Sequence, residues 1–130
     1  MKQFSIGLVQ PNFQQGPVEI NAFYLPYSIG ILWAYAIQDV WIKEHCNLNC
    51  VIFKRDPIKE VVERLKNCDL VGFSTYIWNK NYNYLVAKNL KEVNPNVIVV
   101  FGGPEPPIHQ LDIFAQLPFA DMVVKQEGEI

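Results

Sequence analysis

Short apolar runs alternate along this chain with longer segments whose apolar residues recur every three or four positions. Apolar runs without polar alternation are typical of parallel strands that are covered on both faces. A spacing of i, i+3, i+4 and i+7 is typical of a helix that buries one face. The short runs predict five strands, at Phe4–Val9, Cys50–Phe53, Leu70–Ser74, Val97–Phe101 and Met122–Val124.

Four helix-like segments lie between these strands. The first, Leu25 to about Glu44, is apolar around most of its circumference, which predicts a helix buried on two sides. Asp56 is placed to cap the second helix, with Pro57 at its first position, and Asn79 is placed to cap the third. The apolar stripes of the last three helices are Ile58, Val61, Val62 and Leu65; Tyr82, Leu85, Val86, Leu90 and Val93; and Ile108, Leu111, Phe114 and Leu117.

Alternation of strands and helices predicts an α/β domain with a parallel sheet, right-handed crossovers and helices on both faces. At 130 residues the chain is the size of one domain. A fifth helix would normally cover the edge that follows the last strand, and the sequence stops before one. We therefore expect the chain to be a fragment of a longer protein.

Composition excludes several classes of protein. Half of the residues are hydrophobic, which argues against disorder, and a net charge of −2 without a basic block argues against nucleic-acid binding. The apolar run from Leu25 to Ile42 contains Ser28, Gln38 and Asp39, so we do not expect it to span a membrane. The first apolar run ends too early for a signal peptide, and an odd number of cysteines is typical of reduced thiols. The sequence thus predicts a cytoplasmic protein.

Three loops should meet at the carboxyl ends of the strands, where open α/β sheets bind ligands. They are residues 10–21, 74–79 and 102–106. Ser74 and Thr75 offer hydrogen-bonding hydroxyl groups, and Tyr76 and Trp78 offer flat surfaces for a large planar ligand. The alternative for both aromatic residues is packing against the first helix or against another domain. Candidate ligand contacts in the third loop are Gly102, Gly103, Pro104 and Glu105, and a Cβ at either glycine would occupy space that a ligand needs.

The sequence contains no complete metal site. Cys46 and Cys50 have the spacing C-x3-C, but Phe53 stands where the C-x3-C-x2-C motif of a radical iron–sulfur cluster needs its third cysteine. His45 adds one donor, which still leaves the set incomplete. Cys68 is expected to be buried, and His109 to be a surface or capping residue or a ligand near the glycine loop. No catalytic triad, G-x-G-x-x-G or P-loop motif occurs.

Four segments together resemble the N-terminal cobalamin-binding-like domain of cobalamin-dependent radical S-adenosylmethionine enzymes. They are Leu25–Leu32, Asp69–Asn79, Val99–Pro106 and Asp121–Glu129, in the order and spacing of that family. The resemblance implies a flavodoxin-like sheet in strand order 2-1-3-4-5, with cobalamin across its carboxyl ends. It also implies that S-adenosylmethionine and an iron–sulfur cluster belong to a C-terminal radical domain that this chain lacks.

Residue by residue, Ser74 matches the family's serine after the third strand, and Gly102-Gly103 match its paired glycines. Glu127, Gly128 and Glu129 resemble the signature that leads toward the radical domain, and they either contact the ligand or are solvated. Cobalamin domains that supply an axial histidine carry D-x-H-x-x-G after the first strand, where this chain has Gln10, Asn12 and Gln15. Any cobalamin bound here is therefore expected to be base-off, without a histidine from this loop.

Three functions remain open at this point. The first is a cobalamin-binding module of a radical enzyme that performs methyl transfer or a related reaction. The second is a docking domain of such an enzyme that binds no cobalamin. The third is an unrelated flavodoxin-like nucleotide-binding module. In each case the isolated chain is not expected to be catalytic, and the exposed side of its first helix, around Trp33, Tyr35 and Trp41, would contact the missing domain or a second copy.

Overall fold

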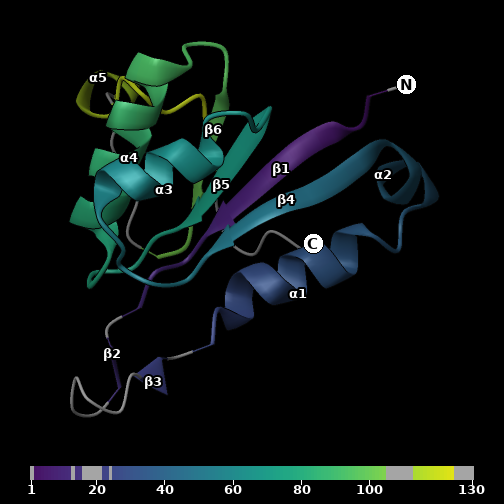
Figure 1. The fold of residues 1–130 in the computed structure, drawn as a ribbon, viewed down its shortest axis with the longest axis horizontal. Helices are drawn as coiled ribbons and strands as arrows, with labels where there is room; N and C mark the ends of the chain where they lie inside the picture. Colours follow the sequence, from purple (N-terminus) through teal and green to yellow (C-terminus); the bar gives the residue numbers. More distant parts are fainter. Residues whose placement is uncertain (1, 13, 16–21, 24, 105–112, 125–130) are drawn as a thin grey trace.

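The computed structural model describes residues 2–12, 14–15, 22–23, 25–104 and 113–124. Its main sheet has five strands in the order β4-β1-β5-β6-β7, all paired in parallel (Figure 1). When the five strands of this sheet are numbered 1 to 5 along the chain, this is the predicted order 2-1-3-4-5 of a flavodoxin-like sheet. The strands are β1 (Phe4–Val9), β4 (Cys46–Ile52), β5 (Leu70–Ser74), β6 (Ile98–Gly102) and β7 (Met122–Val123). A separate antiparallel pair joins β2 (Gln14–Gln15), within the first predicted loop, to β3 (Ala22–Phe23), which directly follows that loop.

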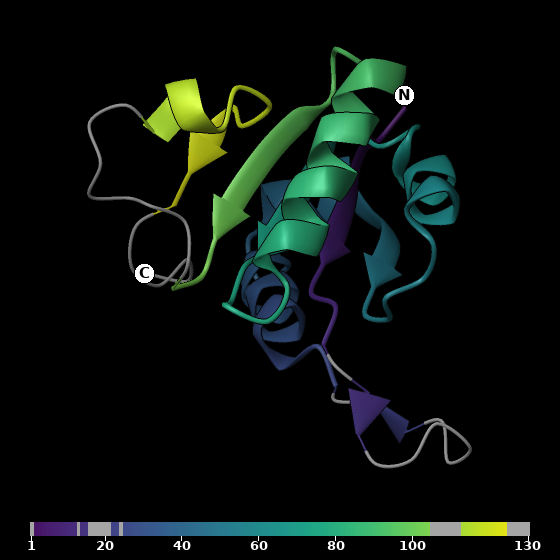
Figure 2. The ribbon, with the colours of Figure 1, turned by 90° about the vertical axis from the view of Figure 1, so that its left-hand side faces the viewer.

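Helices lie on both faces of the sheet (Figures 1 and 2). One face carries α3 (Ile58–Leu65) and α4 (Lys80–Val93), and the short helix α5 (Ile113–Gln116) packs into the same core. The other face carries α1 (Tyr27–Ala36). The main core lies under α3 and α4, where Val71, Phe73, Val99, Phe101, Leu65 and Leu90 are almost fully buried.

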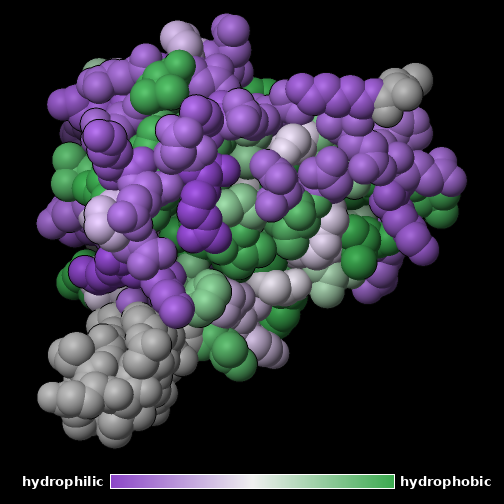
Figure 3. Space-filling model, in the orientation of Figure 1, coloured by the Kyte–Doolittle hydropathy of each residue, from purple (hydrophilic) through white to green (hydrophobic). Residues whose placement is uncertain are grey.

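The sheet face that α1 covers is much more exposed than the face under α3 and α4. Side chains alternate between the faces along each strand, so Leu8, Val100 and Met122 lie on the α1 side. These residues are half-buried or exposed, whereas their neighbours Val9 and Val99 are fully buried. Figure 3 shows apolar side chains gathering across the middle and lower part of the view, over the strands and α1. The domain therefore has an apolar face that α1 covers only in part.

The prediction of one long first helix was wrong. The segment forms α1 and a second helix, α2 (Val40–His45), separated by a turn. The amide groups of Gln38 and Asp39 donate to the carbonyl groups of Tyr35 and Ala36, which ends α1. The Asp39 carboxylate then accepts from the amide of Ile42 at 3.1 Å and caps α2. Because the helix is broken, Trp41 belongs to α2 and is exposed.

Three other helix predictions need correction. Asp56 does not cap α3, since Pro57 occupies the N-cap position, and the Asp56 carbonyl group accepts instead from the Tyr82 hydroxyl group. The stripe of α3 is confirmed, but Leu85 and Val93 of α4 are exposed, while Asn83 and Ala87 are buried in their place. Phe114 is exposed as well, and α5 buries Ile113. The predicted positions Ile108 and Leu111 lie outside the described residues.

Strand β4 begins at Cys46, four residues before its predicted start. Its register with β1 shifts between Ile6 and Gly7, so that Cys46 pairs with Phe4 and Cys50 pairs with Gly7. Phe4 and Gly7 are three residues apart on one strand, and their partners therefore point to opposite faces of the sheet. Burial raises the pKa of the Cys50 thiol, although Arg64 acts in the opposite direction. This geometry keeps the two cysteines from ligating one metal ion together.

Across the part of the chain that the structure describes, we find no helix long and apolar enough to cross a membrane.

Candidate functional site

An apolar cleft opens between α1 and the carboxyl ends of the central strands. Its volume is about 210 Å³. Strands β1, β5 and β6 form its floor, and α1 forms one wall. Its lining residues are Leu8, Ile29, Leu32, Gly72, Phe73, Ser74, Val100, Gly102, Gly103 and Val124. Three of the predicted site residues, Ser74, Gly102 and Gly103, therefore come together here.

Two glycines on the floor make room for the cleft. A Cβ added at Gly102 would have only the Cβ of Val124 within 4 Å, at 3.9 Å, and would enter open space. A Cβ at Gly72 would meet the end of the Leu8 side chain at 3.1 Å. A ligand can therefore approach the backbone of β5 and β6 closely where the side chains are missing. Gly72 was not among the predicted site residues, although a glycine inside an apolar strand is a signal for close approach.

Gly103 has a different role from Gly102. Its φ angle is +93°, a region that residues with a side chain rarely adopt. A Cβ at this position would lie 2.5 Å from the carbonyl oxygen of Thr75 and 2.8 Å from its backbone nitrogen. The expectation that a ligand needs this space was wrong for Gly103, because the backbone of Thr75 occupies it.

Asparagine side chains hold the loop that follows β5. The Asn79 amide group donates to the carbonyl groups of Pro11, at 3.0 Å, and Ser74, at 3.1 Å, and its oxygen accepts from the amide of Tyr76 at 2.8 Å. Asn79 stands at the N-cap position of α4 as predicted, but its side chain does not cap the helix. It joins the first loop to the β5–α4 loop.

Thr75 belongs to the same buried network. The Asn83 amide group donates to the carbonyl group of Ser74 at 3.2 Å and to the Thr75 hydroxyl oxygen at 3.1 Å. Thr75 is fully buried and does not line the cleft. Its side chain therefore supports the loop, while Ser74 is the hydroxyl residue beside the cleft.

Tyr76 and Trp78 form an aromatic pair at the rim of the sheet. Their rings are stacked, with centroids 4.7 Å apart and planes 4° apart. The Tyr76 hydroxyl group shares a hydrogen bond of 2.7 Å with the hydroxyl group of Ser28 on α1. The Trp78 indole N–H donates to the Asn12 side-chain oxygen at 3.0 Å. Trp78 is still 41% exposed, so the pair offers a flat surface that hydrogen bonds hold in place at both ends.

Gln10 and Asn12 turn toward the protein. The Gln10 side-chain oxygen accepts from the amide of Ile29 at 3.2 Å, near the start of α1. Both side chains are buried, and neither lines the cleft. The position that a ligating histidine would take is therefore filled by an asparagine that holds Trp78.

The remaining candidates lie apart from the cleft or outside the described residues. Pro104 is exposed beside Gly103. Glu105, His109, Glu127, Gly128 and Glu129 are outside the described residues. His45 lies at the other end of the strands from the cleft, directly before the first residue of β4. Among the described residues, no group of three or more His, Cys, Asp or Glu could hold a metal ion.

Replacing Asn79 by alanine should destabilise the domain by about 2 kcal/mol, because one buried side chain satisfies three backbone groups. Urea unfolding followed by circular dichroism measures this. Asn89→Ala is the matched control on the same helix, since the Asn89 side chain is hydrogen-bonded only to the Leu85 carbonyl group in an exposed position. Equal losses in the two variants would contradict the role of Asn79.

Residues 38–130, most of the chain, match the protein family described as B12 binding domain. The chain belongs to this family. Its sheet and strand order are those of a B12-binding domain, and the resemblance to the domain of cobalamin-dependent radical enzymes is confirmed.

Curated relatives of this B12-binding domain include two methyltransferases and a cyclase. It is 35% identical over 114 residues to the cobalamin-dependent radical SAM methyltransferase TokK of Streptomyces tokunonensis, covering 87% of this chain and 17% of that protein. It is 34% identical over 113 residues to the 2-(S-pantetheinyl)-carbapenam-3-carboxylate methyltransferase of Streptantibioticus cattleyicolor, covering 86% and 17%. The anaerobic magnesium-protoporphyrin IX monomethyl ester cyclase of Rubrivivax gelatinosus is 27% identical over 128 residues, covering 93% and 22%. The chain spans about a fifth or less of the length of these relatives.

Proposed function

We propose that this B12-binding domain holds cobalamin at the carboxyl edge of its sheet, with the nucleotide tail in the cleft and the macrocycle against the aromatic pair Tyr76–Trp78. The observation that carries the proposal is the cleft itself, whose floor lacks side chains at Gly72 and Gly102. Family membership supports the same ligand.

The size and polarity of the cleft fit one end of the cofactor. An apolar cavity of about 150 Å³ is enough to bind benzene. At about 210 Å³ the cleft suits a bicyclic base and is too small for the macrocycle. The macrocycle must then lie outside, where Trp78 presents its exposed surface. Ser74 stands where tail and macrocycle would join, and it can hydrogen-bond to the polar part of the tail.

The lower face of the cobalt would receive no histidine from the first loop. Asn12 stands at that position and accepts a hydrogen bond from Trp78. If the cleft held the base of the tail, that base would not be available to the cobalt, and the cofactor would be base-off. When bound, cobalamin supplies a cobalt centre able to accept and pass on a methyl group. The chain's own residues bind the tail, orient the macrocycle and shield its lower side.

The remaining part of the parent protein is proposed to carry the chemistry. Methyltransferase relatives that are about six times longer than the aligned region support a radical domain with S-adenosylmethionine and an iron–sulfur cluster. The partly exposed face around α1, including the exposed residues Tyr27 and Tyr35, is a suitable surface for that domain. The alternative is a contact between two copies of the chain through the same helix.

A docking domain that binds no cobalamin is the second candidate. It is favoured by the internal hydrogen bonds of Gln10, Asn12 and Thr75, which leave these side chains committed to the protein. The family match argues against the third hypothesis, an unrelated nucleotide-binding module.

Titration of the chain with hydroxocobalamin under ultraviolet–visible spectroscopy separates the two candidates. We expect saturable binding of one equivalent and the band shift that accompanies loss of the base from cobalt. Asn12→His should bind as well, and it should move the spectrum toward that of a nitrogen-ligated cobalt only if the macrocycle lies over this loop. An unchanged spectrum up to high micromolar cobalamin would favour the docking domain.

A further inference from the structure

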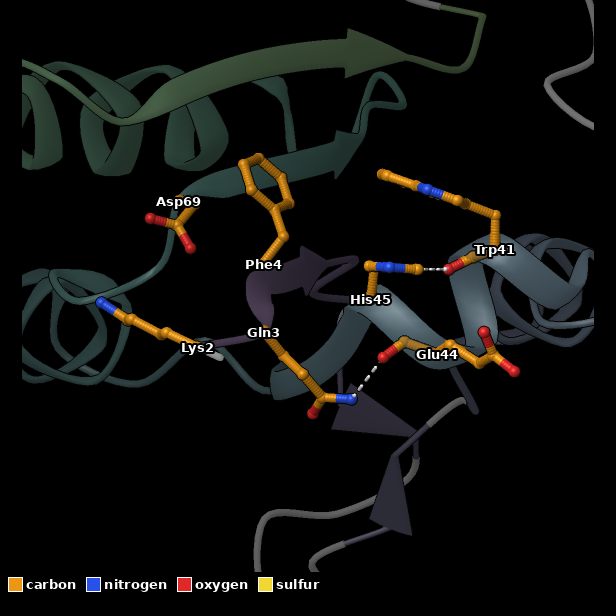
Figure 4. Close-up of a pocket in the computed structure, with 7 residues that line it drawn as sticks. All are labelled: Lys2, Gln3, Phe4, Trp41, Glu44, His45 and Asp69. Atoms are coloured by element: carbon orange, nitrogen blue, oxygen red, sulfur yellow. Dashed lines mark hydrogen bonds between the residues drawn. The ribbon is translucent and has the colours of Figure 1, made fainter.

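A second cleft lies at the amino ends of the strands, opposite the proposed cobalamin site at their carboxyl ends. It has a volume of about 430 Å³ and lies where β1, β4 and β5 begin, beside α2. Its lining residues are Lys2, Gln3, Phe4, Trp41, Glu44, His45 and Asp69 (Figure 4). None of them takes part in the site described above.

The walls of this cleft are aromatic. Trp41 and His45 lie one turn apart on α2 and stack, with ring centroids 4.6 Å apart and an angle of 16° between the planes. His45 Nδ1 donates to the Trp41 carbonyl oxygen at 2.8 Å, which fixes the orientation of its ring. Phe4 projects from β1 on the same side as the Trp41 ring (Figure 4). Trp41 is 62% exposed and Phe4 is 38% exposed, so the pair presents open aromatic surface rather than core packing.

Two carboxylate residues, Asp69 and Glu44, are also among the lining residues of this cleft. Asp69 is held at the start of β5, where one of its oxygens accepts from the backbone amide of Ser5 at 2.8 Å. Glu44 follows Trp41 on α2, and its carbonyl group accepts a hydrogen bond of 3.1 Å from the side chain of Gln3, the residue before β1. Among the described residues, neither carboxylate is in an ion pair. Lys2 is the cation among the lining residues, so the lining carries a net negative charge when His45 is neutral.

We propose that this cleft is a docking site for an arginine side chain presented by a protein partner. A guanidinium group is planar and stacks on an indole ring, and its fork of N–H donors pairs with carboxylates. Trp41 would supply the ring, and Asp69 and Glu44 the opposite charge. An apolar side chain would leave both carboxylates without an ion-pair partner, and a lysine would lack a planar group that can stack on the Trp41 ring.

Peptide binding followed by nuclear magnetic resonance of the 15N-labelled chain tests this assignment. The probes are acetyl-Gly-Arg-Gly-amide, the same peptide with citrulline, which keeps the shape but lacks the charge, and the same peptide with leucine. We expect the arginine peptide to shift the Trp41 indole N–H signal and to bind about fivefold more tightly than either other peptide. Trp41→Leu should remove this binding, and Asp69→Asn with Glu44→Gln should make the arginine and citrulline peptides equal. Phe114→Leu, at an exposed aromatic residue of α5 outside the cleft, should change nothing.

Several outcomes would overturn the proposal. Equal binding of arginine and citrulline peptides to the wild-type chain would show that the charge is not recognised, and tighter binding of the leucine peptide would mark an apolar contact. Free arginine that binds as tightly as the peptide would indicate a small-molecule site in place of a protein partner. No shift with any peptide at tens of millimolar would remove the site altogether. Circular dichroism of each variant shows whether a loss comes from unfolding.

Discussion

Replacing Gly103 by valine should destabilise the domain by about 3–5 kcal/mol, a large part of the about 5–15 kcal/mol by which a domain is usually stable. A β-branched residue at a φ of +93° is strained on its own. The new Cβ would also lie 2.5 Å from the carbonyl oxygen of Thr75, a backbone atom that cannot rotate away. Because the Thr75 amide donates to the Gly102 carbonyl group at 2.9 Å, relief of the clash would also strain or break this bond.

Thermal unfolding followed by circular dichroism measures the effect. Gly30→Ala is a suitable control, since a Cβ there meets no atom within 4 Å and alanine favours the helix. It should stabilise the domain slightly. A native melting temperature for Gly103→Val would show that the turn after β6 can relax. The size of the side chain at position 103 would then be restricted only by a bound ligand.

Gly102→Val should leave the fold intact and weaken cobalamin binding about tenfold to hundredfold. A side chain at position 102 enters the cleft, with its nearest neighbour at 3.9 Å, and valine is favourable in a strand. Filling space that a ligand group needs costs about 1–3 kcal/mol in a packed site. The loss of affinity is therefore expected without a loss of stability, which is the reverse of the effect at Gly103.

Spectroscopic titration with hydroxocobalamin, run beside a melting curve, gives both quantities for each variant. Leu85→Ala on the opposite side of the domain provides a control for general effects on the fold, since Leu85 is exposed and far from the cleft lining. Cobalamin affinity equal to that of the wild-type chain would mean that the tail does not use the cleft. The macrocycle would then have to bind by the aromatic pair alone.

The strand pattern was the most dependable part of the sequence. Val99 and Phe101, like Val71 and Phe73, belong to apolar runs because both faces of their strands are covered. These runs predicted the strands themselves, and the family resemblance implied their order in the sheet. The first helix was mispredicted because only two polar residues, Gln38 and Asp39, interrupt its apolar run before it resumes at Val40. Only the capping hydrogen bond from Ile42 shows that this aspartate starts a new helix.

The paired glycines show why site residues are harder to predict. Gly102 and Gly103 are adjacent and both line the cleft, yet an added Cβ would enter open space at Gly102 and would meet the backbone of Thr75 at Gly103. Thr75 lies 27 to 28 positions earlier, and no local pattern reports that contact. Asn12 and Trp78 are likewise separated by 66 positions, so their hydrogen bond appears only when the two loops meet.

The sequence by itself determined the parallel α/β architecture, the loops that carry the site and the absence of a histidine after the first strand. These depend on local spacing and on residue identity. Tertiary structure decided which side chains face a ligand and which hold the scaffold, because that depends on neighbours brought from distant segments. It also decided that the face under α1 stays partly exposed and that Phe4, Trp41 and Asp69 meet at the far edge of the sheet. Packing across strands, which no local pattern contains, is the physical reason.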